Sequence, residues 1–248
     1  MNLAAISYDA VETLKRFAAA NHISYPLLSD TGSAVIKAFG LLNTNMPPSV
    51  FAYGVPFPGQ FLLSPDGIVR EKFFLPNYRL RTAGSAVLME LTGEGAAGNT
   101  TVLATQPLRA RIELSAGSAF TGQQLAFSLA FSVGEGWHIY GAPLPESYTP
   151  LSMRLDDEVV AQWSLDLPAP VPMRFAELNE TLPVYRGEFR GRGKLLIKSQ
   201  LEPGEYHLRG TLSFQACHAT ICEPPRTLAW ELPVKVLPAV PAPPKPAS

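Results

Sequence analysis

Hydrophobic and polar positions alternate along the chain from residue 107 onward, and this pattern predicts β-strands. In the segment 125–133, apolar residues occupy every second position, with Ala or Ser between them. Segments 206–214 and 228–236 have the same period of two, which Gly210 interrupts once. Strict alternation places one face of a strand against a core and the other face in solvent. About eight such short strands, separated by turns rich in Pro and Gly, predict an all-β sandwich.

The first 95 residues instead mix helical and extended patterns. The predicted helices are 11–20, 30–39 and 81–91, and the predicted strands are 60–63 and 68–74. Asp9 would cap the first helix. Pro65-Asp66-Gly67 predicts a hairpin turn between the two strands, because Pro fixes one dihedral and Gly permits a positive φ. This part of the chain therefore predicts a mixed α/β domain.

A change of composition marks the boundary between the two parts. Residues 92–106 are rich in Gly, Ala and Thr and have no hydrophobic period, which is typical of a linker. Residues 239–248 are rich in Pro and cannot form a packed element. We therefore expect an α/β domain over 1–95, a linker over 96–106, the sandwich over 107–238 and an extended tail after it.

Composition and charge exclude some classes of function. The chain has 248 residues, 46% of them hydrophobic and 17% charged, so it can bury a sizeable core. Its net charge is −1 and no basic stripe stands out, whereas phosphate binding needs concentrated Lys and Arg. No apolar run approaches the roughly 20 residues that span a bilayer, and the first residues do not resemble a signal peptide. We expect neither a nucleic-acid partner nor a membrane span in this chain.

Familiar cofactor and catalytic motifs do not occur in the sequence. The glycines around Lys194 lack the spacing of a phosphate loop, and there is no Gly-x-Ser-x-Gly elbow. The histidines show no metal-ligand spacing. A soft copper site built from the two cysteines and His218 is the alternative that we considered and set aside. We therefore expect no cofactor and no metal.

The two cysteines are the strongest chemical signal. Cys217 and Cys222 have four residues between them, and alternating strands precede and follow the pair. They should therefore flank the tip of a hairpin, close enough to form a disulfide. A structural disulfide across so short a loop would contribute only about 2 kcal/mol, and the sandwich has enough core without it. On this pattern a redox role and a structural role are both open.

Two neighbours of the cysteines bear on their chemistry. His218 follows the first cysteine, where a protonated imidazole would stabilise a thiolate. The alternative is that His218 is a solvent-exposed turn residue. Pro224 and Pro225 would stiffen the chain as it leaves the hairpin and keep the tip from continuing as a paired ladder.

The cysteine segment resembles the active-site hairpin of a known family. Gln215-Ala216-Cys217, four further residues and Cys222-Glu223-Pro224-Pro225 are similar to the amino-terminal periplasmic domain of thiol:disulfide interchange proteins of the DsbD family. Segments 136–140 and 182–186 resemble that family's Gly-aromatic-x-x-Tyr strand and its Ile-Tyr-Arg segment. The resemblance covers about residues 107–237, and the cysteine motif is its most specific part.

The resemblance implies an immunoglobulin-like sandwich in the bacterial periplasm. Its cysteine pair would exchange electrons with thioredoxin-fold proteins. Cys222 matches the family cysteine that forms the mixed disulfide, and Cys217 matches the one that resolves it. Tyr140, Tyr185 and His218 would be neighbours of this site.

The sequence departs from the family pattern in two places. The loop between the cysteines is one residue shorter than in the best-known member. The family's aromatic cap over the active site should fall near Leu178 and Asn179, and neither is aromatic. Both departures affect how well the cysteine pair is shielded from solvent and what reduction potential it has.

The first domain has a resemblance of its own. Residues 6–40 are similar to the middle of an AhpC/TSA peroxiredoxin or a TlpA-like thioredoxin fold, and 58–67 resemble that family's Pro-x-x-Phe-Leu-Ile-Asp-x-x-Gly strand. Pro58 then matches the cis-proline beside the active site, the alternative being an ordinary loop proline. The family's catalytic cysteine would lie upstream, and no cysteine precedes Cys217. We therefore expect a partial fold without peroxidase activity, either a fragment of a longer chain or a degenerate partner-binding domain.

Together the two resemblances predict a thiol–disulfide oxidoreductase that contributes to cell redox homeostasis. Its partners would be thioredoxin-fold redox proteins, including its own thioredoxin-like domain in a longer chain. The alternative is a non-catalytic interaction module with a structural disulfide.

Overall fold

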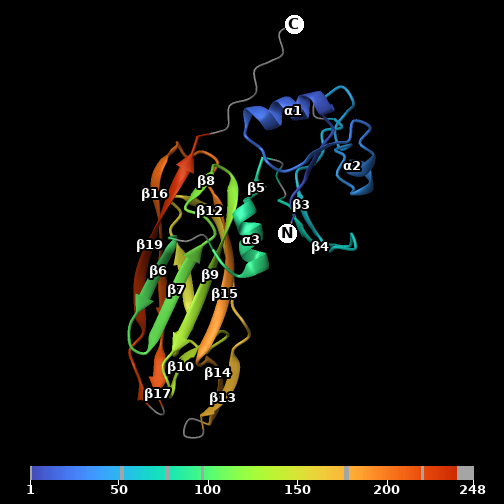
Figure 1. Ribbon diagram of the computed structural model, residues 1–248. Coiled ribbons are helices and arrows are strands. Elements are labelled where there is room, and N and C mark those ends of the chain that lie inside the picture. The colour runs from blue at the N-terminus through green and yellow to red at the C-terminus, as the bar shows by residue number, and fades with distance from the viewer. Residues whose placement is uncertain are drawn as a thin grey trace. The chain divides into compact units, whose positions relative to one another are not determined.

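The computed structural model describes residues 2–50, 53–75, 77, 79–95, 98–175, 179–218 and 221–238 (Figure 1). The chain divides into two compact units. Among the described residues, the first unit comprises those before residue 79 and the second those from Arg79 onward.

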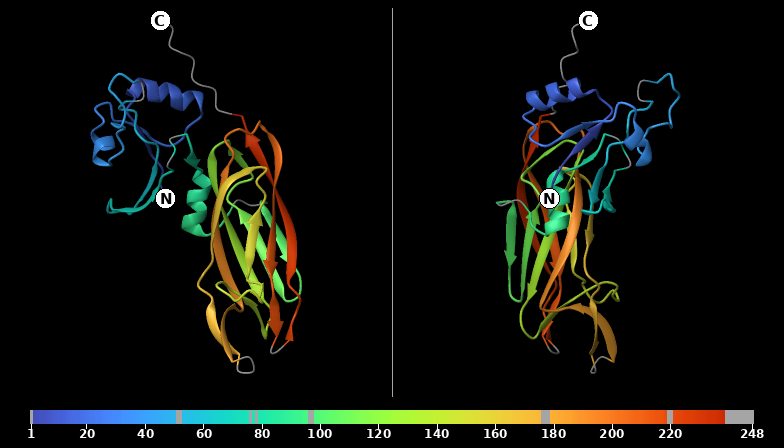
Figure 2. Two further views of the ribbon diagram at one scale, coloured as in Figure 1. Left: turned by 180° about the vertical axis from the view of Figure 1, so that it is seen from behind. Right: turned by 45° about the vertical axis from the view of Figure 1, so that its right-hand side comes forward.

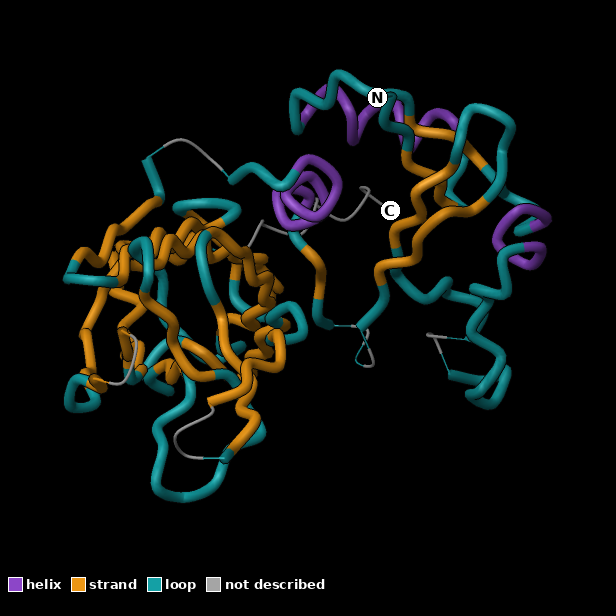
Figure 3. The backbone as a smooth tube through the Cα atoms, turned by 90° about the horizontal axis from the view of Figure 1, so that it is seen from below, coloured by secondary structure: helices purple, strands orange, loops and turns teal. Residues whose placement is uncertain are grey.

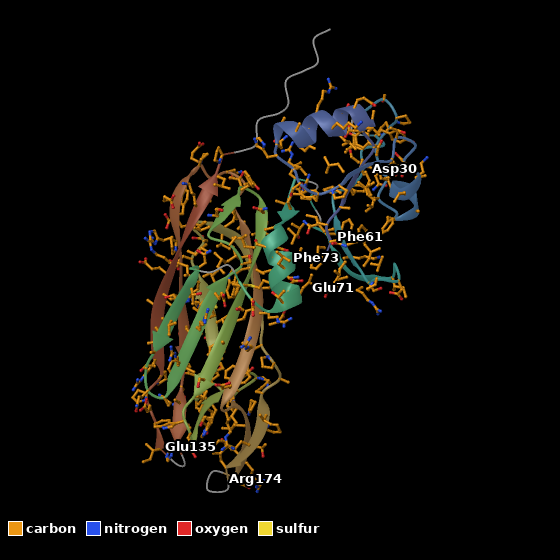
Figure 4. All side chains as sticks on the ribbon, viewed as in Figure 1. Asp30, Phe61, Glu71, Phe73, Glu135 and Arg174 are labelled. Atoms are coloured by element: carbon orange, nitrogen blue, oxygen red, sulfur yellow. A yellow bond between two sulfur atoms is a disulfide. The ribbon has the colours of Figure 1, made fainter. Side chains whose placement is uncertain are left out.

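The first unit is a small α/β assembly. Its elements are β1 (Ala5–Ser7), α1 (Val11–Ala20), β2 (Leu27–Ser29), α2 (Ala34–Ala38), β3 (Gln60–Leu63) and β4 (Val69–Phe73). Strands β1 and β2 pair in parallel, whereas β3 and β4 form an antiparallel hairpin. The predicted turn is confirmed, because Ser64 N donates to Ile68 O at 2.9 Å and Gly67 has φ 81°. Phe61 of this hairpin (labelled in Figure 4) packs edge-on against Phe39 and Phe74.

Two details of the helix predictions are wrong. The N-cap of α1 is Ala10 and it makes no side-chain cap, while the Asp9 carboxylate accepts a hydrogen bond from the Ser7 hydroxyl at 2.5 Å. Helix α2 begins four residues later than predicted. The reason is Asp30, whose carboxylate accepts from the backbone N of Ala34 and Ile36, both at 2.9 Å, and so fixes the chain ahead of the helix.

The second unit is a β-sandwich with one helix (Figures 1 and 2). Its elements are β5 (Arg81–Thr82), α3 (Gly84–Thr92), β6 (Thr100–Ala104), β7 (Leu108–Leu114), β8 (Ser118–Phe120), β9 (Gln123–Val133), β10 (Trp137–Tyr140), β11 (Ser152–Leu155), β12 (Val160–Asp166), β13 (Val171–Phe175), β14 (Glu180–Tyr185), β15 (Glu188–Ile197), β16 (Gly204–Phe214), β17 (Ala216–His218), β18 (Ile221–Cys222) and β19 (Arg226–Leu237). The fold class predicted from the alternating pattern is confirmed.

These strands form three sheets. One has the order β12-β15-β9-β7-β6, with β5 pairing with β9, and a second has the order β11-β16-β19-β8. Figure 3 looks toward the end of the sandwich from below. At this end lies the third sheet, β13-β14-β10-β17-β18, whose strands are short.

The main core lies between the first two sheets and follows the predicted alternation. On β9 the residues of the predicted apolar face, Leu125, Phe127, Leu129, Phe131 and Val133, are all buried, and Ala126 of the opposite face is buried as well. Strands β16 and β19 contribute buried residues of the same cluster, among them Leu212, Phe214 and Val234. Each fully buried large apolar side chain stabilises the fold by roughly 1.5–3 kcal/mol relative to exposure.

The predicted domain boundary and linker are wrong in part. Strand β5 pairs in parallel with β9, and Ala86 and Met89 of α3 pack in the sandwich core, so this segment belongs to the second unit. Within the predicted linker, Thr100–Ala104 forms β6 and pairs with β7. A segment without a clear period can still satisfy its backbone hydrogen bonds as an edge strand. Residues 96, 97 and 239–248 lie outside the described part of the chain.

Candidate functional site

The two cysteines lie opposite each other in a short hairpin. Cys217 on β17 and Cys222 on β18 are direct cross-strand partners. They form a disulfide with a Cα–Cα distance of 4.0 Å. This confirms that the pair flanks a hairpin and can bridge. The tip of the hairpin, residues 219 and 220, lies outside the described residues.

The two cysteine residues differ in their exposure to solvent. Cys217 is 1% exposed, whereas Cys222 is an exposed residue on the outermost strand of its sheet. Its neighbour Ile221 is 72% exposed. An incoming thiolate would therefore reach the sulfur of Cys222 before that of Cys217.

The hydroxyl of Tyr140 lies close to both sulfur atoms of the disulfide. Its hydroxyl oxygen lies 3.3 Å from the Cys217 sulfur and 3.5 Å from the Cys222 sulfur. A disulfide has no S–H, so the tyrosine hydroxyl is the donor in both contacts and sulfur is a weak acceptor. Burial raises the pKa of Tyr140, and nearby Tyr148 and Glu180 raise it further. The hydroxyl therefore keeps its proton at neutral pH and remains available to the sulfurs.

A second tyrosine supports the first. The Tyr148 ring packs edge-on against the Tyr140 ring at 5.0 Å between centroids. The Tyr148 hydroxyl donates to the Glu180 carboxylate at 2.8 Å, and this hydrogen bond raises the pKa of Tyr148. Glu180 thereby holds the Tyr148 ring, which in turn restricts the ring of Tyr140.

An aromatic side chain and a histidine complete this side of the sheet. The ring of Phe175 lies 5.2 Å from His138 and 6.4 Å from Tyr140. Tyr140, Leu182, Val184 and Cys217 form a small buried cluster on which Phe175 packs. We refer to these residues, with His138, Tyr148 and Glu180, as the site cluster.

Gln215 fastens the hairpin to its surroundings. Its side-chain nitrogen donates to the backbone O of Glu223 at 3.3 Å, across the hairpin. Its side-chain oxygen accepts from the backbone N of Thr149 at 3.2 Å, in the loop that carries Tyr148. The glutamine of the cysteine motif therefore joins both strands of the hairpin to the loop beside Tyr140.

Two predicted neighbours of the cysteines lie on the other face of their sheet. His218 follows Cys217 directly, so the pleat directs their side chains to opposite faces, and the exposed His218 ring lies 5.3 Å from that of Trp137. Tyr185 pairs with Ile139 and packs in the main core, where its hydroxyl donates to Pro168 O at 2.9 Å. Neither placement brings the side chain to the sulfur atoms.

Pro58 lies in the first unit, and of its two alternatives the peptide bond favours the ordinary loop proline over the cis-proline that the resemblance implies. The cis bonds of the described residues precede Pro107 and Pro143, so the bond before Pro58 is trans. A cis bond has to be stabilised by its surroundings because the trans form is favoured even before proline. A role of Pro58 beside an active site stays a prediction.

Of the two residues at which the family's aromatic cap was expected, only Asn179 belongs to the described part of the chain. Leu178 is not described, and Asn179 has a positive φ of 54° next to β14. The aromatic side chain near Tyr140 comes instead from Phe175, at the end of β13. Strand β13 was not among the predicted strands; it is an edge strand, where its Pro172 is tolerated. Arg174 on this strand is labelled in Figure 4.

Other residues of the site cluster were also not predicted. Tyr148 and Glu180 lie in a loop and at the start of a strand, without a period that would mark them. His138 had a usable signal, since it lies two positions before Tyr140 on one strand and therefore on the same face.

This geometry defines a β-sandwich domain that carries a disulfide between one buried and one exposed cysteine at its end. The chain belongs to the family described as thiol:disulfide interchange protein DsbD, N-terminal, whose model matches residues 109–232. The AhpC/TSA family model matches residues 1–72. Family membership and the disulfide together support thiol–disulfide interchange in general.

Two of the solved structures to which the chain is similar are N-terminal domains of ScsB and DsbD. The N-terminal periplasmic domain of ScsB from Proteus mirabilis is 18% identical with a TM-score of 0.42, and the match covers 58% of this chain and 55% of that one. The reduced N-terminal domain of DsbD from Neisseria meningitidis is 12% identical with a TM-score of 0.29, covering 45% and 82%. The chain thus spans about half the length of the ScsB domain that it matches.

The search of curated proteins gave no match. Among the described residues, no helix has the length and apolar character needed to cross a membrane.

Proposed function

We propose that the sandwich transfers electrons by thiol–disulfide exchange with thioredoxin-fold proteins through Cys217 and Cys222. The observation that carries this proposal is the asymmetry of the disulfide, with Cys217 a buried residue and Cys222 an exposed residue at a sheet edge. A structural disulfide would be protected equally well with both sulfurs buried. Only an exchanging pair needs one sulfur within reach of a partner.

The assignment of roles follows from the same asymmetry. In the reduced protein, the thiolate of Cys222 attacks a sulfur of the partner's disulfide, and the partner's other sulfur leaves with the electron pair. Cys217 then attacks Cys222, which restores the disulfide and releases the partner as a dithiol. The Tyr140 hydroxyl, 3.5 Å from the Cys222 sulfur, can donate to the thiolate and stabilise it.

The residues of this chain do not supply the partner disulfide, so the proposed partners are thioredoxin-fold redox proteins, including the chain's own thioredoxin-like domain in a longer protein. Both cysteines of the sequence lie in the sandwich, and residues 1–78 contain none. The similar ScsB domain is described as periplasmic, and we propose the same oxidising compartment here, with a contribution to redox homeostasis.

The first test is the reduction potential of the pair, measured by equilibrating the protein in thiol buffers and counting alkylated cysteines by mass spectrometry. We expect a value above about −300 mV, in the range of exchange proteins. A lower value would mean a structural disulfide and would refute the proposal.

The second test separates the roles of the two cysteines. Cys217→Ser should trap a mixed disulfide with an oxidised thioredoxin-fold protein, because no thiol remains to resolve it. Cys222→Ser should trap none, because the remaining sulfur is buried. Trapping by Cys222→Ser equal to that by Cys217→Ser would overturn the assignment of roles.

A further inference from the structure

A buried histidine beside the disulfide has an unused ring nitrogen. His138 is 1% exposed, and its Nε2 atom has no hydrogen-bond partner among the described residues. A buried polar atom without a partner costs free energy, so such atoms are rare in folded proteins. The disulfide form of this site therefore carries a cost that another state could relieve.

The sheet places this histidine against the buried cysteine. On β10 and β17, His138 pairs directly with Cys217, and their neighbours Ile139 and Ala216 pair on the other face. Side chains of directly opposed residues share a face, with Cβ atoms about 4.5–5.5 Å apart. Tyr140 lies two positions along the same face, with its ring 5.7 Å from that of His138.

Reduction of the disulfide gives Cys217 a thiol proton that needs a hydrogen-bond acceptor. In the disulfide, the sulfur of Cys217 has no proton to donate. After reduction it carries an S–H group at a position that is 1% exposed, where water does not serve as the acceptor. The hydroxyl proton of Tyr140 is attracted to the Cys222 thiolate, since hydrogen bonds to an ionised acceptor are the stronger ones.

The imidazole is in the right form to accept that proton. Burial lowers the pKa of His138, and the charges of Arg186 and His218 lower it further. Of the charged groups near the cluster, Glu180 is already bonded to Tyr148. His138 is therefore uncharged near neutral pH and has one ring nitrogen with a free electron pair.

We propose that Nε2 of His138 accepts the thiol proton of Cys217 when the disulfide is reduced, which stabilises the reduced form. This inference rests on the exchange function proposed above. When Cys217 attacks the mixed disulfide, the Cys217–Cys222 bond forms and the bond from Cys222 to the partner's sulfur breaks. The partner's thiolate leaves with the electron pair, and the proton of Cys217 passes to Nε2 and then to the departing thiolate or to water.

The proposal predicts a shift in the redox equilibrium when the acceptor is removed. In His138→Phe, the disulfide form no longer contains an unpaired buried nitrogen, and the reduced form has lost its acceptor. Both changes favour the disulfide. We expect the equilibrium constant for reduction by glutathione to fall about tenfold, equivalent to about 30 mV for a two-electron couple.

The experiment uses the full chain in glutathione buffers, with alkylated cysteines counted by mass. His138→Gln retains a side-chain acceptor, so its equilibrium constant for reduction should stay within about twofold of the wild-type value. That change is smaller than the tenfold change, about 30 mV, expected for His138→Phe. His207→Phe, at an exposed position on β16, is the control for loss of a histidine and should not change the equilibrium. An unchanged or increased constant in His138→Phe would overturn the inference.

Two further readouts keep the outcome decisive. Nitrogen NMR of the wild-type imidazole in both redox states needs no substitution, and a ring-nitrogen shift that does not change on reduction would refute the proposed hydrogen bond. If wild type itself resists reduction, the exchange function fails and the inference fails with it. If wild type exchanges and His138→Phe behaves identically, only the role of His138 fails.

Discussion

The main core of the sandwich and the site cluster use opposite faces of the same short strands. On β10, Ile139 packs in the main core, while Tyr140 and His138 face the disulfide. The main core is apolar and its side chains are fixed by packing. The site cluster instead mixes apolar side chains with a buried imidazole, two phenol groups and a carboxylate. One face of the strand therefore supplies stability and the other supplies chemistry.

The largest effect should come from emptying part of the main core. Leu129 on the central strand β9 is 0% exposed, so Leu129→Ala should lower the free energy of unfolding of the sandwich by about 2–5 kcal/mol. Urea denaturation followed by tryptophan fluorescence would measure this. The redox equilibrium of the folded variant should stay as in wild type. Val102→Ala, at a position that is 45% exposed, is the control, and an equal loss there would contradict the account.

A smaller loss should follow from adding a methyl group to the main core. Gly193 pairs with Phe127 across β15 and β9, and a Cβ at Gly193 would lie 2.1 Å from the Phe127 ring. The ring must move, so Gly193→Ala should cost about 1–3 kcal/mol. Gly84→Ala, at the start of α3 where no atom lies within 4 Å of the added Cβ, is the matched control. A destabilisation shared by both variants would mean that backbone freedom and not the ring is responsible.

On the face of β10 toward the disulfide, removal of one hydroxyl group should change the pKa of a thiol more than it changes the free energy of unfolding. Tyr140→Phe removes the group within 3.5 Å of both sulfurs, so the thiolate of Cys222 loses a donor and its pKa should rise by about one unit or less. Thiolate absorbance and alkylation rates of the reduced protein would measure this. Tyr148→Phe keeps the ring and loses only the hydroxyl bonded to Glu180. If the pKa of the Cys222 thiol rose more in Tyr148→Phe than in Tyr140→Phe, the hydroxyl of Tyr140 would not be the group that stabilises the thiolate.

The smallest expected effect is a pH dependence of stability from His138. Its folded pKa lies below the value of about 6.5 that a free imidazole has. As pH falls below about 6.5, the unfolded chain binds a proton that the folded chain excludes, so the free energy of unfolding decreases. The contribution is complete above pH 6.5 and is lost on acidification. His138→Phe should flatten this slope below about pH 6.5, and a slope equal to that of wild type would contradict the assignment.

The sequence predicted the strands whose two faces differ in polarity. On β9, β16 and β19 the period of two in the apolar residues determines the buried face, since a strand directs alternate side chains to opposite sides. The same logic predicted the hairpin that carries Cys217 and Cys222, and the disulfide follows from that hairpin. Local patterns were sufficient because these features depend on neighbours in the chain.

The sequence pattern did not predict features that depend on partners far along the chain. Strand β6 and helix α3 belong to the sandwich because of their contacts with β7 and β9. These contacts cannot be predicted from the residues of β6 and α3 alone. Strand β13 was not predicted either, and only the sheet order shows that it lies at an edge, where a proline is tolerated. The sequence also left open whether Pro58 is a cis-proline or an ordinary loop proline, since the surroundings of a proline decide its isomer.

The sequence by itself thus determined the alternating strands, the hairpin and the identity of the cysteine pair. Only the tertiary structure decided which sulfur is buried, which hydroxyl lies against both of them, and which histidine faces Cys217. The physical reason is that burial and hydrogen bonding are set by strand pairing. Residues 138, 140, 148, 175 and 217 come together through register and sheet order, which no local period encodes.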